Sequence, residues 1–153
     1  MAGKVAIVIG SKSDKIIADK AETILVNFGI AFETFVISAH RTPNKIRKFA
    51  REAEASGFSV IIAIAGLAAH LPGVIASMTA LPVLGVPAEG GPLNGRDALL
   101  SIVQMPSGIP VACVGIGNGS NAALLAAGIL GSADLSLREK IKEYRKRFED
   151  DAD

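Results

Sequence analysis

The 153-residue chain has little of what several classes of protein depend on. It contains one cysteine and two histidines, so it cannot form an intrachain disulfide and is poor in ligands for a metal centre. The formal net charge of +1 creates no field that would attract nucleic acid or an anionic membrane. The amino terminus, MAGKVAIVIG, lacks the features of a signal peptide. We therefore expect a cytoplasmic protein that holds no metal, with Cys113 as a buried and inert thiol.

Charged residues are scarce in the middle of the chain. Residues 55–133 hold only Glu89, Arg96 and Asp97, whereas residues 135–153 hold twelve charged side chains. Hydrophobic residues make up 50% of the chain, but glycine and proline cut the longest apolar stretch to less than the about 20 residues that span a bilayer. A monomer of this composition would expose apolar helix faces to water. We therefore expect a homo-oligomer that buries them.

Short apolar runs rich in valine and isoleucine alternate with helical patterns along the chain. The runs predict buried strands at residues 4–10, 31–38, 59–66, 82–88 and 110–117. Helices are expected at residues 11–29, 42–57, 70–79, 94–105 and 120–131, followed by a C-terminal helix at about 135–149. This alternation predicts an α/β fold: a single three-layer αβα domain over residues 1–153, core 4–131, with a five-stranded parallel sheet of flavodoxin-like type.

Local signals mark the ends of two of these helices. Thr42 and Pro43 predict an N-cap and a first-turn proline, and Ser136 with Glu139 predicts a capping box for the last helix. The last helix should also bury an apolar stripe, formed by Leu137, Ile141, Tyr144 and Phe148.

The loops after the strands carry most of the candidate chemistry. In open parallel sheets, ligands bind outside the carboxyl ends of the strands. The five loops are GSKSD (10–14), SAHRTP (38–43), GLAAHLPG (66–73), PAEGGPLNG (87–95) and GIGNGSN (115–121). Both histidines, His40 and His70, follow a strand closely, which favours a functional role for at least one of them.

The GSKSD loop suits an anion or a ribose. Ser11 and Ser13, together with the first amides of the following helix, can form a cradle of hydrogen-bond donors. Asp14 would repel a phosphate, so if it faces the ligand it should accept hydrogen bonds from sugar hydroxyls. Helix capping explains Ser13 and Asp14 equally well. The loop has neither the P-loop ending nor the G-x-G-x-x-G fingerprint.

The two histidine loops add groups for phosphate binding and proton transfer. Arg41 offers a planar fork that fits a phosphate, although an ion pair with Asp14 is an equally good explanation. His40 can give or take a proton near neutral pH. The small residues of GLAAH present backbone amides that can hold a carboxylate or an oxyanion. The residues alone thus predict a phosphorylated, sugar-containing small ligand without naming a reaction.

The segments GSKSD, SAHRTP, AGLAAHLPG, PVLGVP, SIVQMPSGIPV and NAALLAA, in this order, resemble the class I N5-carboxyaminoimidazole ribonucleotide mutases of purine biosynthesis. The resemblance covers residues 5–131. It implies isomerisation of N5-carboxyaminoimidazole ribonucleotide to 4-carboxy-5-aminoimidazole ribonucleotide, by release of carbon dioxide and its recapture at ring carbon 4. It also implies a homo-octamer that needs no metal, cofactor or ATP.

The resemblance assigns roles to individual residues. It makes His40 the proton shuttle, gives His70 a supporting role, and places phosphate at Arg41 and nearby serines, with the ribose hydroxyls at Asp14. The implied substrate-binding residues are Ser11, Ser13, Asp14, Ser38, Ala39, Arg41, Gly66, Leu67, Ala68, Ala69 and Leu71.

The chain departs from the usual pattern of this family at three places. Leu67 stands where glycine is usual and would be strained if that position requires a positive φ. Glu89 adds an acid, and loop 115–121 is short. Two alternatives remain open: a carboxylase that uses free carbon dioxide and aminoimidazole ribonucleotide, and a non-catalytic nucleotide-binding paralogue. The forms HRTP and AAHLPG favour the class I mutase.

Overall fold

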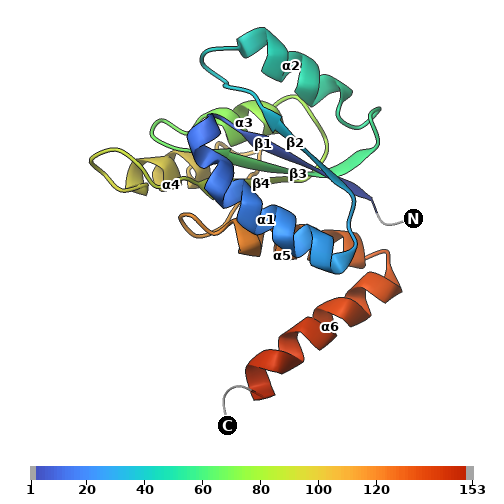
Figure 1. The fold of residues 1–153 in the computed structure, drawn as a ribbon. Helices are drawn as coiled ribbons and strands as arrows, with labels where there is room; N and C mark the ends of the chain where they lie inside the picture. Colours follow the sequence, from blue (N-terminus) through green and yellow to red (C-terminus); the bar gives the residue numbers. More distant parts are fainter. Residues whose placement is uncertain (1–2, 151–153) are drawn as a thin grey trace.

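A five-stranded parallel sheet forms the centre of the computed structural model, which describes residues 3–150 (Figure 1). The strands are β1 (Lys4–Ile9), β2 (Phe32–Val36), β3 (Phe58–Ala65), β4 (Val83–Pro87) and β5 (Ala112–Cys113). Their spatial order is β2-β1-β3-β4-β5, and every neighbouring pair is parallel. This order is the flavodoxin-like arrangement, so the predicted fold class is confirmed.

The central strands are apolar at almost every position because both faces of the sheet are covered. In β1, Val5, Ile7 and Ile9 point into one hydrophobic cluster, whereas Ala6 and Val8 point into a second cluster on the opposite face. β3 alternates in the same way between the two clusters. The continuous Val/Ile runs of the sequence are therefore the signature of a sheet with two buried faces.

Helices cover the two faces unequally. The first cluster contains residues of α1 (Lys15–Phe28) and α5 (Gly119–Gly131), and the second contains residues of α2 (Pro43–Glu52), α3 (Leu71–Ala76) and α4 (Arg96–Val103). The last helix, α6 (Leu135–Asp150), contacts α5 and then extends away from the sheet (Figure 1). No helix within residues 3–150 has the length and hydrophobicity needed to cross a bilayer.

Several predicted boundaries are wrong in informative ways. The strand expected at 110–117 contains only two residues, because β5 is an edge strand that pairs with β4 at two positions. The helix expected at 42–57 ends at Glu52 and is followed by turns. Residues 12–14 form a separate 3-10 turn, η1 (Lys12–Asp14), before α1 begins. Cys113 is half-buried rather than buried, and burial raises the pKa of its thiol.

The predicted caps also differ from those in the structure. Thr42 is the N-cap residue of α2 and Pro43 stands in its first turn, as predicted, but the Thr42 hydroxyl makes no capping hydrogen bond. It donates to the carbonyl of Ser38 at 2.9 Å and accepts from the Ser38 amide at 3.1 Å. At α6, Asp134 takes the place of the predicted Ser136–Glu139 box, because its Oδ1 accepts from the Leu137 amide at 3.1 Å. Phe148, expected in the buried stripe, is 56% exposed.

Two glycines of α5 provide a matched test of how closely α1 and α5 pack. A Cβ at Gly119 would overlap the carbonyl oxygen of Ile17, whereas nothing lies within 4 Å of a Cβ at Gly128. We expect Gly119→Ala to destabilise the protein by about 1–3 kcal/mol through overpacking. Gly128→Ala should be neutral or stabilise it by about 0.5–1 kcal/mol, because alanine favours the helix. Denaturant unfolding of both variants would measure this, and equal stabilities would contradict the packing.

Candidate active site

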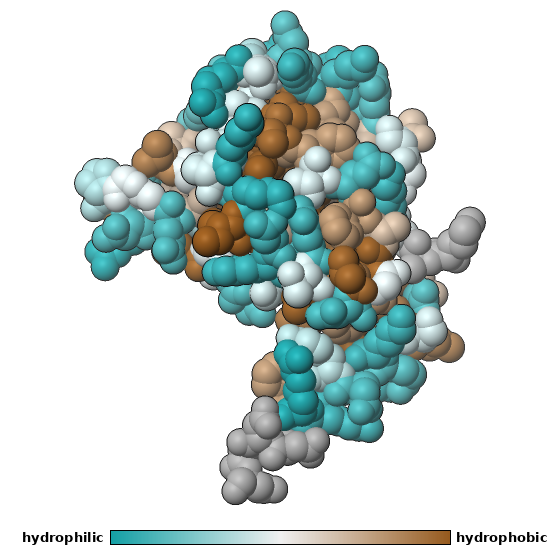
Figure 2. Space-filling view, viewed as in Figure 1, coloured by the Kyte–Doolittle hydropathy of each residue, from teal (hydrophilic) through white to brown (hydrophobic). Residues whose placement is uncertain are grey.

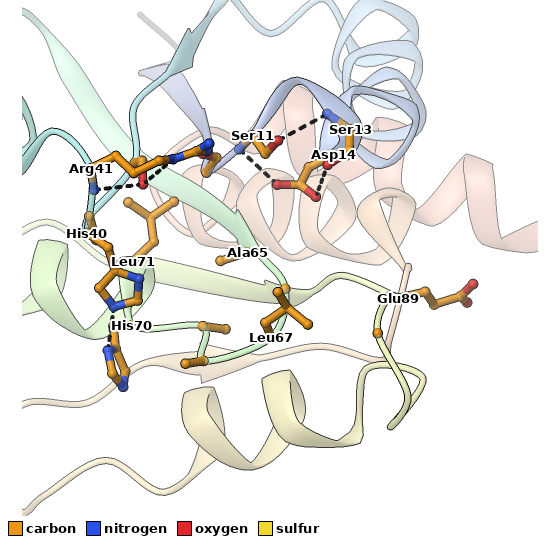
Figure 3. Close-up of a pocket in the computed structure, with 18 residues that line it drawn as sticks. Ser11, Ser13, Asp14, His40, Arg41, Ala65, Leu67, His70, Leu71 and Glu89 are labelled. Atoms are coloured by element: carbon orange, nitrogen blue, oxygen red, sulfur yellow. Dashed lines mark hydrogen bonds between the residues drawn. The ribbon is translucent and has the colours of Figure 1, made fainter.

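Four of the five loops after the strands surround one pocket of about 540 Å³ at the carboxyl ends of the strands (Figure 3). The chain crosses from β1 to β2 on one side and reaches β3 on the other, so the pocket lies at the switch point of the sheet. All thirteen residues that sequence reasoning selected line it: Ser11, Ser13, Asp14, Ser38, Ala39, His40, Arg41, Gly66, Leu67, Ala68, Ala69, His70 and Leu71. Loop 115–121 contributes no lining residue.

The loop after β1 is held by a reciprocal cap around η1. The Ser11 amide donates to Asp14 Oδ2 at 3.0 Å, and the Ser13 amide donates to Ser11 Oγ at 3.4 Å. Both side chains therefore cap the turn and line the pocket at the same time. The amides of Ser11 and Ser13 thus have acceptors within the turn, while both side chains stay at the wall of the pocket.

Asp14 is a buried carboxyl group, 9% exposed, at the wall of the pocket. Its burial raises the pKa above the ordinary value of an aspartate. The hydrogen bonds from the Ser11 amide and the Ser13 hydroxyl act in the opposite direction, as does the positive charge of Arg41. A carboxylate that is desolvated in this way gains from further hydrogen-bond donors, such as the hydroxyls of a sugar.

Arg41 spans the ends of two strands. Its Nη2 donates to the carbonyl of Gly10 at 3.1 Å, and its Nε and backbone amide donate to Ser38 Oγ at 3.4 and 3.2 Å. Among the residues that the structure describes, Arg41 forms no ion pair with Asp14 or another carboxylate. The positive charge of the exposed guanidinium is therefore not neutralised by a direct partner and remains available to an anionic group.

The two histidines of the chain lie in direct contact inside the pocket (Figure 3). The distance from His40 Nε2 to His70 Nδ1 is 2.7 Å, and the two rings meet edge to face. A hydrogen bond between two ring nitrogens needs one donor and one acceptor. The pair therefore holds a proton between the loop after β2 and the loop after β3, and the residues are 30 positions apart in the chain.

The loop after β3 lines the pocket and uses only some of its backbone amides for its own hydrogen bonds. The amides of Ala69 and His70 donate to the carbonyls of Leu67 and Ala68 at 2.8 and 2.7 Å. The amides of Leu67 and Ala68 themselves have no acceptor within the described part of the protein. Leu67 has φ 55°, and a residue of this conformation can turn successive amides toward one side, as in an anion-binding nest. Within GLAAH, only the amides of Ala69 and His70 are used by the loop itself, so those of Gly66, Leu67 and Ala68 stay candidates for holding a carboxylate.

Sequence reasoning did not select five of the lining residues: Gly10, Ala65, Glu89, Gly90 and Gly91. Gly10 and Ala65 lie next to selected residues and lack side chains with chemistry of their own. The Gly90–Gly91 pair after β4 was the one available signal for a close approach of two loops. The side chain of Glu89 points away from the other labelled residues (Figure 3), and its Oε1 lies near Gly117.

Residues 3–150 contain no group of three or more His, Cys, Asp or Glu side chains placed to hold a metal ion. The lining residues carry one cation (Arg41), two carboxylates (Asp14 and Glu89, of which Glu89 points away), three serine hydroxyls, a histidine pair and backbone amides without an acceptor in the part of the chain that the structure describes. These groups suit a small ligand with a phosphate, hydroxyls and a carboxylate.

Comparison with known proteins gives a consistent assignment. The family model described as AIR carboxylase matches residues 4–151. The chain is 56% identical over 142 residues to the N5-carboxyaminoimidazole ribonucleotide mutase of Pyrococcus horikoshii, with 93% of this chain and 80% of that protein covered. It is 54% identical over 148 residues to the protein of the same name from Saccharolobus solfataricus, with 97% and 94% covered. The crystal structure of Treponema denticola PurE superposes with a TM-score of 0.86 at 33% identity, covering 97% and 96% of the two chains.

The raised pKa of Asp14 leads to a stability prediction. As pH rises from 3.8, the unfolded chain loses the Asp14 proton before the folded chain does, so this group lowers stability at neutral pH. Asp14→Asn keeps an oxygen acceptor for the Ser11 amide and removes the charge. We expect this variant to melt at a higher temperature than the parent protein at pH 7, and the gap to shrink as pH falls.

The matched control is Asp19→Asn, which changes an exposed carboxylate of α1 that pairs with Lys15. This substitution should shift the melting temperature very little, because exposed ion pairs contribute little. A lower melting temperature for Asp14→Asn at pH 7, or a gap that does not depend on pH, would contradict the burial argument.

Proposed function

The chain belongs to the AIR carboxylase family, and we propose that it converts N5-carboxyaminoimidazole ribonucleotide to 4-carboxy-5-aminoimidazole ribonucleotide in purine biosynthesis. The observation that carries the proposal is the convergence of the His40–His70 pair, Arg41 and Asp14 on one pocket. The curated relatives that bear the mutase name are 51–56% identical to this chain over most of its length.

The carboxylase alternative has weaker support. The protein of Saccharomyces cerevisiae named phosphoribosylaminoimidazole carboxylase is 48% identical over 147 residues, but the matched part is only 26% of that protein. Its name therefore describes a much longer chain. The mutase relatives, in contrast, match this chain over 80–94% of their own length.

The charges of the pocket suggest how the ribonucleotide lies in it. Arg41 receives the phosphate, with Ser38 and the serines of the loop after β1 close by. Asp14 accepts hydrogen bonds from the ribose hydroxyls, because a carboxylate repels phosphate and its burial leaves it short of donors. The carboxylate of the substrate meets the free amides of Leu67 and Ala68. Ser11, Ser13, Ala39, Gly66, Ala69 and Leu71 complete the walls.

His40 serves as the proton shuttle of this reaction. When the carbamate N–C bond breaks, its electron pair stays on nitrogen, which takes a proton from His40, and carbon dioxide is released into the pocket. Carbon 4 of the ring then attacks the carbon dioxide, and the proton that carbon 4 loses returns to His40. One proton is given and one recovered, so the carboxylate moves without net consumption of any reactant. His70 orients the His40 ring through the contact at 2.7 Å.

The exposed apolar side chains support an assembly of several copies. Among the described residues, nine large hydrophobic side chains outside the pocket are exposed in the single chain: Ile16, Val26, Val36, Leu93, Leu100, Val103, Leu125, Leu135 and Phe148. Figure 2 shows apolar patches among hydrophilic side chains on the face occupied by α1. We take the active form to be a cytoplasmic homo-octamer in which residues 1–153 form a single mutase domain.

A comparison of substrates tests the reaction. The protein is supplied with N5-carboxyaminoimidazole ribonucleotide in buffer depleted of bicarbonate, and separately with aminoimidazole ribonucleotide plus bicarbonate. The proposal predicts rapid formation of the 4-carboxy product in the first mixture and little in the second. Turnover of the second mixture alone would replace the mutase with a carboxylase, and no turnover of either would favour a non-catalytic paralogue.

Replacement of His40 tests its role as the shuttle. His40→Asn keeps a polar side chain that can still hydrogen-bond to His70, but it cannot transfer a proton. Because general acid–base catalysis contributes about 10²–10⁴-fold, turnover should fall by at least that factor. The affinity for the ribonucleotide product, measured by calorimetry, should change little. Full activity of the variant would refute this role, and loss of binding would show that His40 holds the ligand.

A further inference from the structure

Leu67 has an unusual backbone conformation for a bulky residue. Its φ is 55°, and within residues 3–150 the only other non-glycine residue with a positive φ is Asn94, at 50°. Asparagine is common in this region, whereas a leucine there is strained by its own Cβ. Strain of this kind persists where the surrounding structure imposes it, and it clusters at ligand sites. A glycine would adopt this conformation without strain, so the presence of leucine at position 67 must be explained by what its side chain does.

The side chain of Leu67 lies between the loop after β3 and the loop after β4, which both line the pocket. It projects from the loop after β3 and lies between Ala65 and Glu89 (Figure 3). Its Cδ2 lies against the loop after β4, because a Cβ placed on Gly91 would come within 2.7 Å of it. Gly91 itself has φ 61°, so this position suits glycine both for its conformation and for the space that Leu67 takes.

Leu67 is also the one large apolar side chain that stays exposed among the lining residues of the described pocket. It is 55% exposed, whereas Leu71 is buried in the core and the remaining apolar lining residues are alanines. The amide of Leu67 itself and that of Ala68 have no acceptor among the described residues. A side chain at this place can exclude water from the region where those amides meet a carboxylate.

We propose that Leu67 is a gate residue: with the backbone of Gly91 it covers the carboxylate end of the pocket and retains the carbon dioxide released there. This inference rests on the proposed mutase reaction. After the carbamate bond breaks, carbon dioxide is neutral, and no ionic contact holds it beside carbon 4. An apolar cover slows its escape and keeps water away, so the molecule stays until the new carbon–carbon bond forms.

Isotope exchange measures this retention directly. Unlabelled N5-carboxyaminoimidazole ribonucleotide is converted in the presence of ¹³C-bicarbonate and carbonic anhydrase, and the label in the 4-carboxy product is read by mass spectrometry at early times. Label enters the product only when released carbon dioxide exchanges with the solution before recapture. Aminoimidazole ribonucleotide that has left the enzyme can also be carboxylated again from solution, and this route adds label to the product. A parallel reaction that starts from free aminoimidazole ribonucleotide measures how much label enters in this way. Lower activity alone does not change the labelled fraction, which separates gating from a merely structural role.

Four variants make the test specific. Leu67→Ala removes most of the side chain, and Leu67→Gly also removes the backbone strain, so the two do not share a folding defect. Leu67→Met keeps a long apolar side chain and should rescue retention. Leu93→Ala is the matched control, since Leu93 is 54% exposed and lies outside the pocket.

We expect the product of the parent protein, of Leu67→Met and of Leu93→Ala to be nearly unlabelled. Leu67→Ala and Leu67→Gly should raise the labelled fraction about tenfold, the lower end of what a missing apolar group costs in a binding site. Equal labelling of the parent protein and both truncations would overturn the gate, as would complete labelling of the parent product. Absence of turnover by the parent protein would overturn the proposed function instead, so the two failures are distinguishable.

Discussion

The whole site depends on the parallel pairing of β1 with both β2 and β3. This pairing brings the ends of the three strands to one edge of the sheet, and a shift of one residue would turn each side chain to the opposite face. His40 and His70 come from different strands, yet their ring nitrogens lie 2.7 Å apart. Because β1 and β3 are buried on both faces, a slip between them would force the side chains of both hydrophobic clusters to repack. Hydrophobic burial thus fixes the geometry of the polar site.

The sequence pattern predicted the fold class and the order of the elements correctly, but it did not predict where several of the helices and strands end. Buried elements with strong periodicity were predicted well. In the helix expected at 11–29, the apolar residues that recur at helical spacing are buried: Ile17, Ala21, Ile24, Leu25 and Phe28. The errors lie where tertiary contacts compete with local preference. β5 is short because it has one neighbour, and Thr42 turns back to Ser38 instead of capping α2. Local sequence cannot rank such alternatives, since each offers a similar hydrogen bond.

In the candidate site too, the residues could be identified from the sequence, but the contacts between them could not. Residue types and their placement after strands identified the histidines, Arg41 and Asp14, and family resemblance supplied their roles. The contacts could not be predicted, because they join loops far apart in the chain: Arg41 to Gly10, His40 to His70, and Leu67 to Gly91. Asp14 illustrates a further limit, since capping and ligand binding were treated as alternatives for it, and in the structure it both caps η1 and lines the pocket. A short polar loop can serve its own fold and a ligand with the same atoms.

The central claim is that one pocket holds phosphate, ribose and carboxylate at three separate groups. The most direct measurement is a crystal structure of the protein with 4-carboxy-5-aminoimidazole ribonucleotide bound. We expect the phosphate at the guanidinium of Arg41, the ribose hydroxyls at Asp14, and the carboxylate at the amides of Leu67 and Ala68, with carbon 4 within reach of His40. A ligand bound with its phosphate at the loop after β3, or outside the pocket altogether, would refute this assignment of the three groups.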